Sequence, residues 1–461
     1  MKQYYILAVL LVVTMTTAAL AQDIRNITLD EAIEIALDNN IEIQLSRSVI
    51  ERQNSEVRRR QADFFPNLNA TVGGSRTIGR QFDPSIVAFD DFTTNNLNAR
   101  ISTGITIFNG FRNINQLRSA RLARESAEER YQRVREEIIF ESAAMFLDVL
   151  LARELLEIER ENLEANRRQL EQVQAQVEVG MVPIVNQYSQ EAVVANSELA
   201  VIRSENNLNM SQLRMTRLLQ LDPLLEYEFV TPVIQEEEIE ILEYDLGELI
   251  HVAMSNRRDV RAAEMEMQQN RYALNVSQGM RLPEVSLSGG ISTAYRDQQR
   301  QPVLNGSGTE IMPFTDQFFD ANINRSLSFN VSIPIFNRRM TSNQIQQNKI
   351  DLQNAELEYQ DLRQEVFLEL RQAYNDYVGY AQELEATESV LIAAEKAYET
   401  ELERYNVGSA TLIELTNANN EYIQASSNRV QALYQFIFQE KVLDFFLGQI
   451  SEDINFDAFT D

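Results

Sequence analysis

The sequence predicts an α+β membrane protein in which an internal duplication supplies long helices and four strands. Three observations predict this class. One order of residues occurs twice along the chain, four segments alternate between apolar and polar residues, and residues 111–179 contain neither proline nor glycine. The expected architecture is a β-barrel shared between copies, with four strands per chain, joined to long coiled-coil helices.

Composition excludes several kinds of chemistry. The 461 residues carry 41 Lys and Arg against 69 Asp and Glu, a formal net charge of −28. Such an acidic chain lacks the basic surface that nucleic-acid binding requires, so no nucleic-acid partner is expected. Without cysteine there is no disulfide, thiolate metal site or cysteine nucleophile, and His251 is the only histidine. We therefore expect no cofactor and no metal site.

Residues 1–21 have the layout of a secretory signal peptide. Lys2 precedes an apolar core at residues 6–13, and Ala19-Leu20-Ala21 forms a small-residue cleavage site. A membrane anchor is the alternative, but the apolar run is short for one. No later stretch of 18 uncharged apolar residues occurs, so we expect an exported chain without a transmembrane helix.

The duplication keeps two constant offsets. Leu29, Pro66 and Gly73 recur 217 positions later, and Phe108, Tyr131 and Gly180 recur 228 positions later. The change of offset indicates an insertion of 11 residues in the second copy. The predicted organisation is a first repeat at 22–221, an inter-repeat equatorial segment at 222–245, a second repeat at 246–447 and an acidic tail at 448–461.

Each repeat is predicted to open with one helix. In the first copy Thr28 can cap the helix and Glu31 stands three residues on, which is a capping-box pattern. This helix is expected to reach about Phe65, before Pro66. The matching helix of the second copy is expected over residues 246–282.

Four strands are expected at residues 67–77, 100–108, 284–295 and 326–335. In the second of these, Ile101, Thr103, Ile105 and Ile107 share one face. Alternation alone would also suit a soluble sandwich. However, the segments are long enough to span a bilayer when tilted, and their other face carries Ser, Asn, Thr and Gly, which suits a water-filled lumen.

Four strands cannot close a barrel, and an open edge is costly in lipid, so the chain is expected to oligomerise. Two chains would supply eight strands, with an interior filled by side chains, and three would supply twelve, with a channel. The connections at residues 79–97 and 296–324 are long, and we expect them to be loops on the outer surface.

Residues 111–179 are expected to form one coiled-coil helix, because apolar residues recur every seven positions. The recurring positions are Val149, Leu156, Leu163, Leu170 and Val177, matched in the second copy by Tyr377, Leu384, Leu391, Tyr398 and Tyr405. The intermediate seam is mixed, because Ala152 and Val173 are apolar whereas Glu159 and Asn166 are not. A helix lining a tube and a poor two-stranded coil both fit. The helices should turn back at Gly180 and Gly408, each in a left-handed helix cap.

The duplicated plan, the Leu-x-x-Ala-x-x-x-Ala-x-x-Asn opening at residues 29–39, the Ile-Phe-Asn triplets at 107–109 and 335–337, and the Val-Gly turns resemble the TolC-like outer-membrane efflux family. The resemblance covers nearly all of the mature chain. It implies a homotrimer in outer-membrane lipid, with a twelve-strand barrel and a twelve-helix tube in the periplasm. It also implies docking to a periplasmic adaptor (membrane fusion) protein and an inner-membrane pump.

The resemblance also implies site residues. Glu414 stands at the first of two positions that often carry acids around the periplasmic entrance. Asn417 stands at the second and Asn186 at its counterpart in the first copy, so a strongly acidic ring is in doubt. Tyr405 matches a position that helps to hold the entrance closed. The hairpin tips expected to dock the adaptor comprise Gly180, Met181, Val182, Gly408, Ser409 and Ala410, the last standing where a latch arginine can occur.

These features predict a passive exit duct of a tripartite efflux or type I secretion system. A structural or adhesive trimeric coiled coil anchored by a small barrel is the alternative, although a fibre would not need two hairpin tips. An enzyme is not expected, because the chain has no phosphate-binding glycine loop and His251 has no cysteine partner.

Overall fold

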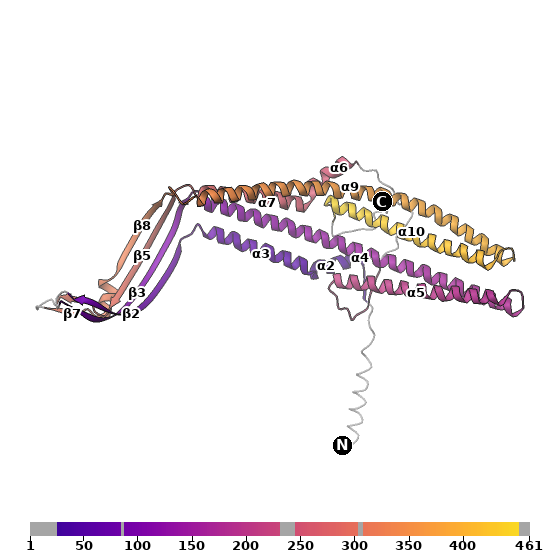
Figure 1. Ribbon diagram of the computed structural model, residues 1–461, viewed down its shortest axis with the longest axis horizontal. Coiled ribbons are helices and arrows are strands. Elements are labelled where there is room, and N and C mark those ends of the chain that lie inside the picture. The colour runs from indigo at the N-terminus through magenta and orange to yellow at the C-terminus, as the bar shows by residue number, and fades with distance from the viewer. Residues whose placement is uncertain (1–24, 84–86, 231–244, 303–307, 451–461) are drawn as a thin grey trace, which may run out of the picture. The chain divides into compact units, whose positions relative to one another are not determined.

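The computed structural model describes residues 25–83, 87–230, 245–302 and 308–450 (Figure 1). The predicted signal peptide, most of the inter-repeat segment and most of the acidic tail lie outside these residues. The chain divides into two compact units. The first contains residues 1–48, 129–261 and 360–461, and the second contains residues 49–128 and 262–359. Each unit therefore combines residues from both halves of the predicted duplication.

The helix that opens each repeat is in fact two helices. The first copy has α2 (Leu29–Asn39) and α3 (Ile41–Ala62), and the second has α6 (Leu246–Asn256) and α7 (Arg258–Gly279). The breaks fall at Asn40 and Arg257, whose ψ angles of 131° and 125° are not helical. Asn40 starts the next helix, because its side-chain oxygen accepts a hydrogen bond from the Glu42 N–H at 2.7 Å. The prediction of one continuous helix was wrong at both sites.

The capping box at the start of α2 is confirmed. The Thr28 hydroxyl accepts a hydrogen bond from the Glu31 N–H at 3.3 Å, and the Glu31 carboxylate accepts one from the Thr28 N–H at 3.1 Å. These two bonds satisfy backbone donors that a helix start otherwise leaves unpaired.

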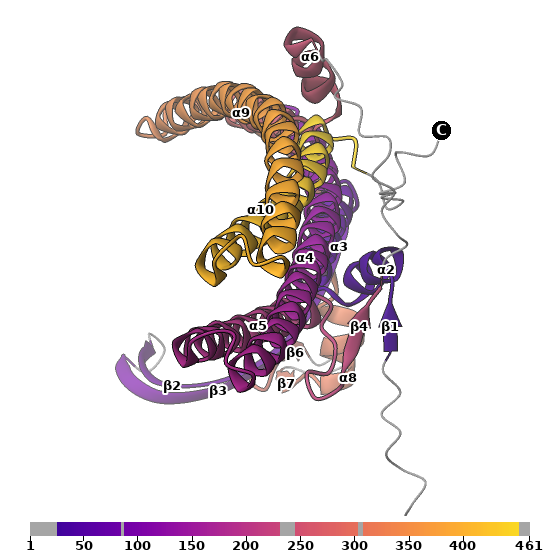
Figure 2. The same cartoon turned by 90° about the vertical axis from the view of Figure 1, so that its right-hand side faces the viewer.

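The two long helices are also confirmed. They are α4 (Arg112–Glu178) and α9 (Met340–Asn406), and each turns back into a shorter helix, α5 (Ile184–Leu218) or α10 (Leu412–Leu447). Figure 2 shows the two helix pairs, α4 with α5 and α9 with α10. The seven-residue seam faces inward along much of its length. Its buried positions are Val149, Leu156, Leu163, Tyr377, Leu384 and Tyr405.

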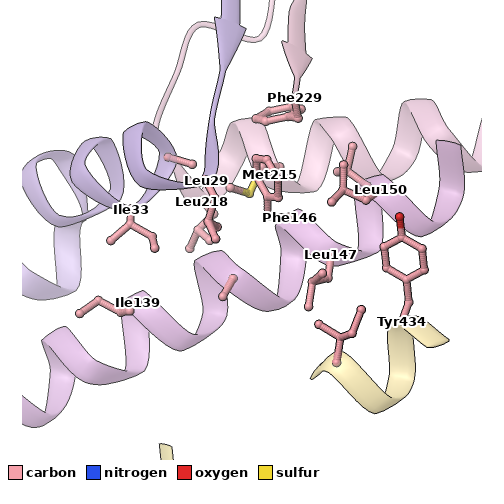
Figure 3. Close-up of a cluster of buried hydrophobic side chains, with 14 of the residues drawn as sticks. Leu29, Ile33, Ile139, Phe146, Leu147, Leu150, Met215, Leu218, Phe229 and Tyr434 are labelled. Carbon is pink, nitrogen blue, oxygen red and sulfur yellow. The ribbon is translucent and has the colours of Figure 1, made fainter. Parts of the chain in front are cut away.

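The main hydrophobic core lies in the first unit, where α2, α4, α5 and α10 meet (Figure 3). Phe146 of α4 and Met215 of α5 are fully buried there. A pair of strands that the sequence pattern did not predict completes the core. Strand β1 (Arg25–Ile27) pairs in parallel with β4 (Tyr227–Phe229), and the Phe229 ring packs edge-on against Phe146 with centroids 6.1 Å apart.

The second unit contains a four-stranded antiparallel sheet in the order β2-β3-β5-β8. Its strands are β2 (Asn67–Asp83), β3 (Ala88–Asn109), β5 (Glu284–Arg296) and β8 (Asn324–Ser332). All four predicted strands are present. The last ends three residues early, just before Ile333-Pro334, since proline cannot donate a ladder hydrogen bond.

The two connections expected to be loops are largely structured. Strands β2 and β3 continue as a hairpin through most of residues 79–97. Cross-strand pairs such as Thr77 with Thr94 and Phe82 with Phe89 stabilise this extension. The second connection contains β6 (Arg300–Pro302), β7 (Thr309–Ile311), the helical turn α8 (Phe314–Asp316) and the π-helical turn η2 (Gln317–Ala321). The prediction of plain loops was therefore wrong.

The strand register places the predicted apolar positions on one face of the sheet. Val285 lies opposite Val331, Leu287 opposite Phe329, and Ile291 opposite Ile101. One correction concerns Ile107. A bulge between Thr106 and Phe108 shifts the register, so Phe108 and not Ile107 faces Val285. The other face carries mainly Ser, Asn, Thr and Gly.

Strands β2 and β8 are the edges of this sheet, and each has one side without a neighbouring strand in the four-stranded order. Among the described helices, none is both long and apolar enough to cross a bilayer.

Candidate functional site

The turns between the paired helices form the candidate site. Gly180 and Gly408 have φ of +75° and +79°, the left-handed conformation that the sequence predicted. In the first turn the Met181 N–H donates to the Gln176 carbonyl at 2.8 Å, and the second turn repeats this bond from Ser409 to Arg404 at 2.8 Å. A Cβ at either glycine would meet no atom within 4 Å. The glycines are therefore needed for backbone conformation and not for space.

A groove of about 810 Å³ lies between the two turns. Its walls combine apolar side chains such as Met181, Val182 and Ile413 with polar ones. The predicted site residues that line it are Met181, Val182, Asn186, Tyr405, Gly408, Ala410 and Asn417. The fold thus brings together residues that are more than 200 positions apart in the sequence.

Tyr405 anchors one side of this groove. Its ring packs with Val173, Leu412 and Leu415, and 9% of the residue is exposed. Its hydroxyl donates a hydrogen bond to the Gln176 side-chain oxygen of α4 at 3.4 Å. Burial raises the pKa of this phenol, so it remains a neutral donor at physiological pH. A bond from the Gln172 amide to the Asn406 side-chain oxygen at 3.3 Å lies close by.

Glu414 is placed differently. It does not line the groove, and its carboxylate accepts a hydrogen bond from the Thr411 N–H at 2.7 Å and from the Thr411 hydroxyl at 2.9 Å. The N–H bond first, and the hydroxyl bond second, lower the pKa of this carboxyl, so it stays charged. Glu414 therefore forms the capping box that starts α10. The resemblance implies an entrance acid at this position, whereas the structure shows a carboxylate that caps its own helix.

A buried polar layer beyond the groove was missed by sequence analysis. The Asn166 amide donates to the Ser197 hydroxyl at 3.0 Å, and the Asn419 amide of α10 donates to the Asn162 side-chain oxygen of α4 at 3.0 Å. Gln190 donates to the Asn166 carbonyl at 3.2 Å. The layer joins helices of both pairs. Its only sequence signal was the asparagine that interrupts the apolar seam at position 166.

Comparison with known proteins agrees with this fold. The model of the family described as "Outer membrane efflux protein" matches residues 32–220 and 249–449. The outer membrane efflux protein BepC of Brucella suis is 22% identical over 98% of this chain and 91% of its own. The outer membrane protein TolC of Vibrio cholerae is 22% identical over 71% of each chain.

The structure is similar to the CmeC outer membrane channel of Campylobacter jejuni, with a TM-score of 0.78 and 16% identity over 93% of this chain and 87% of that one. That likeness concerns the fold. The family match covers most of the sequence, and its two segments fall on the two halves of the duplication. The chain therefore belongs to the outer membrane efflux protein family, a family of efflux channels and not of enzymes.

Proposed function

We propose that three copies of this chain form a passive exit duct through the outer membrane. The observation that carries the proposal is the open four-stranded sheet, whose edge strands β2 and β8 have no partner on their outer sides within the sheet. In a bilayer each unpaired backbone group costs several kcal/mol, so these edges need partners. Other copies of the same sheet can supply them.

The sheet is built to be completed by copies of itself. All three of its strand pairings are antiparallel, so β2 and β8 also run in opposite directions. Strand β8 of one copy can therefore pair with β2 of the next in the same antiparallel pattern. Three copies give twelve strands, which are enough to enclose a channel. The face rich in Ser, Asn and Thr would line the lumen, and the face with Leu287 and Phe329 would meet lipid.

The paired helices would continue this duct as a tube in the periplasm. At its tips, Gly180, Met181, Val182, Gly408, Ser409 and Ala410 would dock the periplasmic adaptor protein. The groove supports this role because exposed apolar side chains such as Met181 and Ile413 lie beside polar ones in it, a mixture that protein interfaces also have. Tyr405, Asn186 and Asn417 would border the entrance. Energy for export would come from the inner-membrane pump, since the chain itself is a conduit.

Cysteine cross-linking between β2 and β8 tests this assembly, because the native chain has no cysteine. One cysteine replaces Asn69, Thr71 or Gly73 on β2, and a second replaces Ser326, Ser328 or Asn330 on β8. Within one chain the strands β3 and β5 lie between β2 and β8, so the backbones of β2 and β8 are about 14 Å apart. Since a disulfide requires Cα atoms within about 7 Å, any bond must join two copies. Oxidation of at least one combination is expected to give covalent trimers.

The pair Asn69→Cys with Ser102→Cys is the matched control. These residues face each other within one chain, so oxidation should leave a monomer on the gel. Covalent dimers without trimers, or no link at all between copies, would contradict the proposal. Cross-linked trimers in a planar bilayer should conduct in discrete steps. Silent but inserted trimers would favour the anchored fibre instead.

Glu414→Gln tests whether this acid borders the entrance. Glutamine can keep the capping box with Thr411, whereas three negative charges are lost from the trimer. If Glu414 faces the ion path, the concentration of a multivalent cation that half-blocks the channel from the tip side should rise several-fold. Glu414→Ala should weaken the block similarly and also destabilise the start of α10. Unchanged block in the glutamine variant would remove Glu414 from the entrance.

A further inference from the structure

An aromatic cluster lies in the connection between β5 and β8. Phe314 stacks on Phe318 with centroids 5.1 Å apart, and Phe319 packs edge-on against Phe318 at 5.3 Å. Tyr295, near the end of β5, meets Phe314 edge-on at 5.1 Å. The rings are not hidden, because Phe319 is 65% exposed and Phe314 is 41% exposed. We call residues 314–321 the aromatic segment.

The aromatic segment is held firmly against β5. The fully buried Gln317 side chain accepts a hydrogen bond from the Arg296 N–H at 2.9 Å and donates to the Arg296 carbonyl at 3.0 Å. Just after the segment, the Asn322 amide donates to the Ala294 carbonyl at 2.6 Å. These bonds cover the backbone of β5 where its pairing with β8 has ended. The segment is therefore a fixed part of the sheet unit.

The contacts also show which face of the sheet the segment covers. Side chains alternate along a strand, so Thr293 and Tyr295 share the face of Leu287 and Ile291. Tyr295 touches Phe314, and the Thr293 hydroxyl donates to the Phe318 carbonyl at 2.6 Å. Both contacts lie on the apolar face. The segment therefore folds over the apolar side of the sheet and away from the side proposed to line the lumen.

We propose that the aromatic segment is an interfacial anchor that lies in the headgroup region of the outer leaflet, a surface that contacts lipid. This inference rests on the proposed membrane function of the sheet. The rings extend the apolar face of the sheet past the point where β5 and β8 stop pairing. The acidic residues Asp316 and Asp320 of the same segment are exposed. Aromatic rings beside charged groups are typical of the membrane–water boundary, where one part of the segment is in apolar surroundings and the other in water.

The height of the segment fits this boundary. From Val285 to Tyr295 the strand advances ten residues, which at a tilt of about 45° gives a rise of about 23 Å. The apolar band of such barrels is about 25 Å tall and has aromatic girdles at both rims. At the other end of the span, Phe108 faces Val285 and packs edge-on against Phe111 at 5.2 Å. Aromatic pairs thus bracket a span of the expected height.

Tryptophan fluorescence can test the anchor, because the native chain contains no tryptophan. Phe319→Trp places one reporter in the segment of the full-length protein. In phosphatidylcholine vesicles brominated close to the headgroup its emission should be strongly quenched. Lipids brominated near the end of the acyl chain should quench it less, and aqueous iodide should quench it weakly.

Two control variants separate the anchor from the membrane sheet. Phe329→Trp lies on the apolar face of β8, opposite Leu287, and should be quenched by brominated lipid and protected from iodide. Leu224→Trp is in the first unit, in a highly exposed position, and should be quenched by iodide. If Phe329→Trp resists every brominated lipid, the proposed membrane sheet fails and the anchor with it.

If only Phe329→Trp is quenched by lipid, the proposed function survives and the anchor is overturned. Strong iodide quenching of Phe319→Trp would then identify a loop in water. Protection from both iodide and brominated lipid would identify a contact with a neighbouring copy. Stronger quenching of Phe319→Trp by the deeper bromines would also overturn the interfacial placement.

Discussion

Phe146→Ala is expected to destabilise the first unit by about 3–5 kcal/mol, the range for emptying a buried phenylalanine site. Phe146 is fully buried in the main core and contacts the Phe229 ring. The cavity could not close easily, because Phe229 is held on the other side by strand pairing and by a hydrogen bond from Arg153 to its carbonyl. Denaturant unfolding followed by helical circular dichroism measures the change.

The matched control for this substitution is Phe367→Ala in the same unit. Phe367 is 39% exposed, so water already contacts much of the ring and its truncation should cost far less. Equal losses in the two variants would contradict the assignment of Phe146 to a core that cannot close around the cavity.

Arg257→Ala is expected to cost about 3 kcal/mol near neutral pH, as for a buried ion pair that loses one partner. Arg257 lies at the break between α6 and α7, and 3% of its side chain is exposed. Its guanidinium donates to the Asp259 carboxylate at 2.6 Å and to the Glu369 carboxylate at 2.7 Å. Because both carboxylates are partly exposed, the cost should stay at the lower end of the range for buried pairs.

The effect of Arg257 should depend on pH. Burial alone would raise the pKa of Asp259, but the hydrogen bonds and charge of Arg257 lower it overall. The stabilisation is therefore complete above the unfolded pKa of about 3.9 and is lost as pH falls through the lower folded value. Wild type and Arg257→Ala should converge in free energy of unfolding at acid pH. Urea titrations at a series of pH values measure this.

Arg258→Ala is the control for Arg257→Ala. Arg258 is the next residue and also contacts two carboxylates, at 3.1 Å on Glu129 and 3.6 Å on Glu136, but 36% of its side chain is exposed. Because water reaches the Arg258 side chain and Glu136 also contacts Arg133, the loss of Arg258 should cost less than the loss of Arg257. A difference between wild type and Arg257→Ala that stays constant with pH would contradict the assigned role of Asp259.

Much of the candidate site was predictable because its signals are local. A glycine after a long apolar seam predicts a left-handed cap, and both turns have one. By contrast, Glu414 shows how a local rule can be overlooked. The Thr411-x-x-Glu414 spacing is itself a capping box, as at Thr28, and the structure uses it in that way. The buried layer around Asn166 depends on distant partners such as Asn419, which no spacing along one helix reveals.

The sequence by itself determined the elements whose causes lie within a few residues. Period-two alternation defined the strands, and the absence of proline and glycine allowed α4 to continue unbroken. The predicted cap at Thr28 and the glycine turns at Gly180 and Gly408 marked three helix ends. Only the tertiary structure decided where the opening helices break, which face the aromatic segment covers and how the two turns form one groove. Those outcomes depend on contacts between side chains far apart in the chain, and such contacts leave no periodic trace in either partner's sequence.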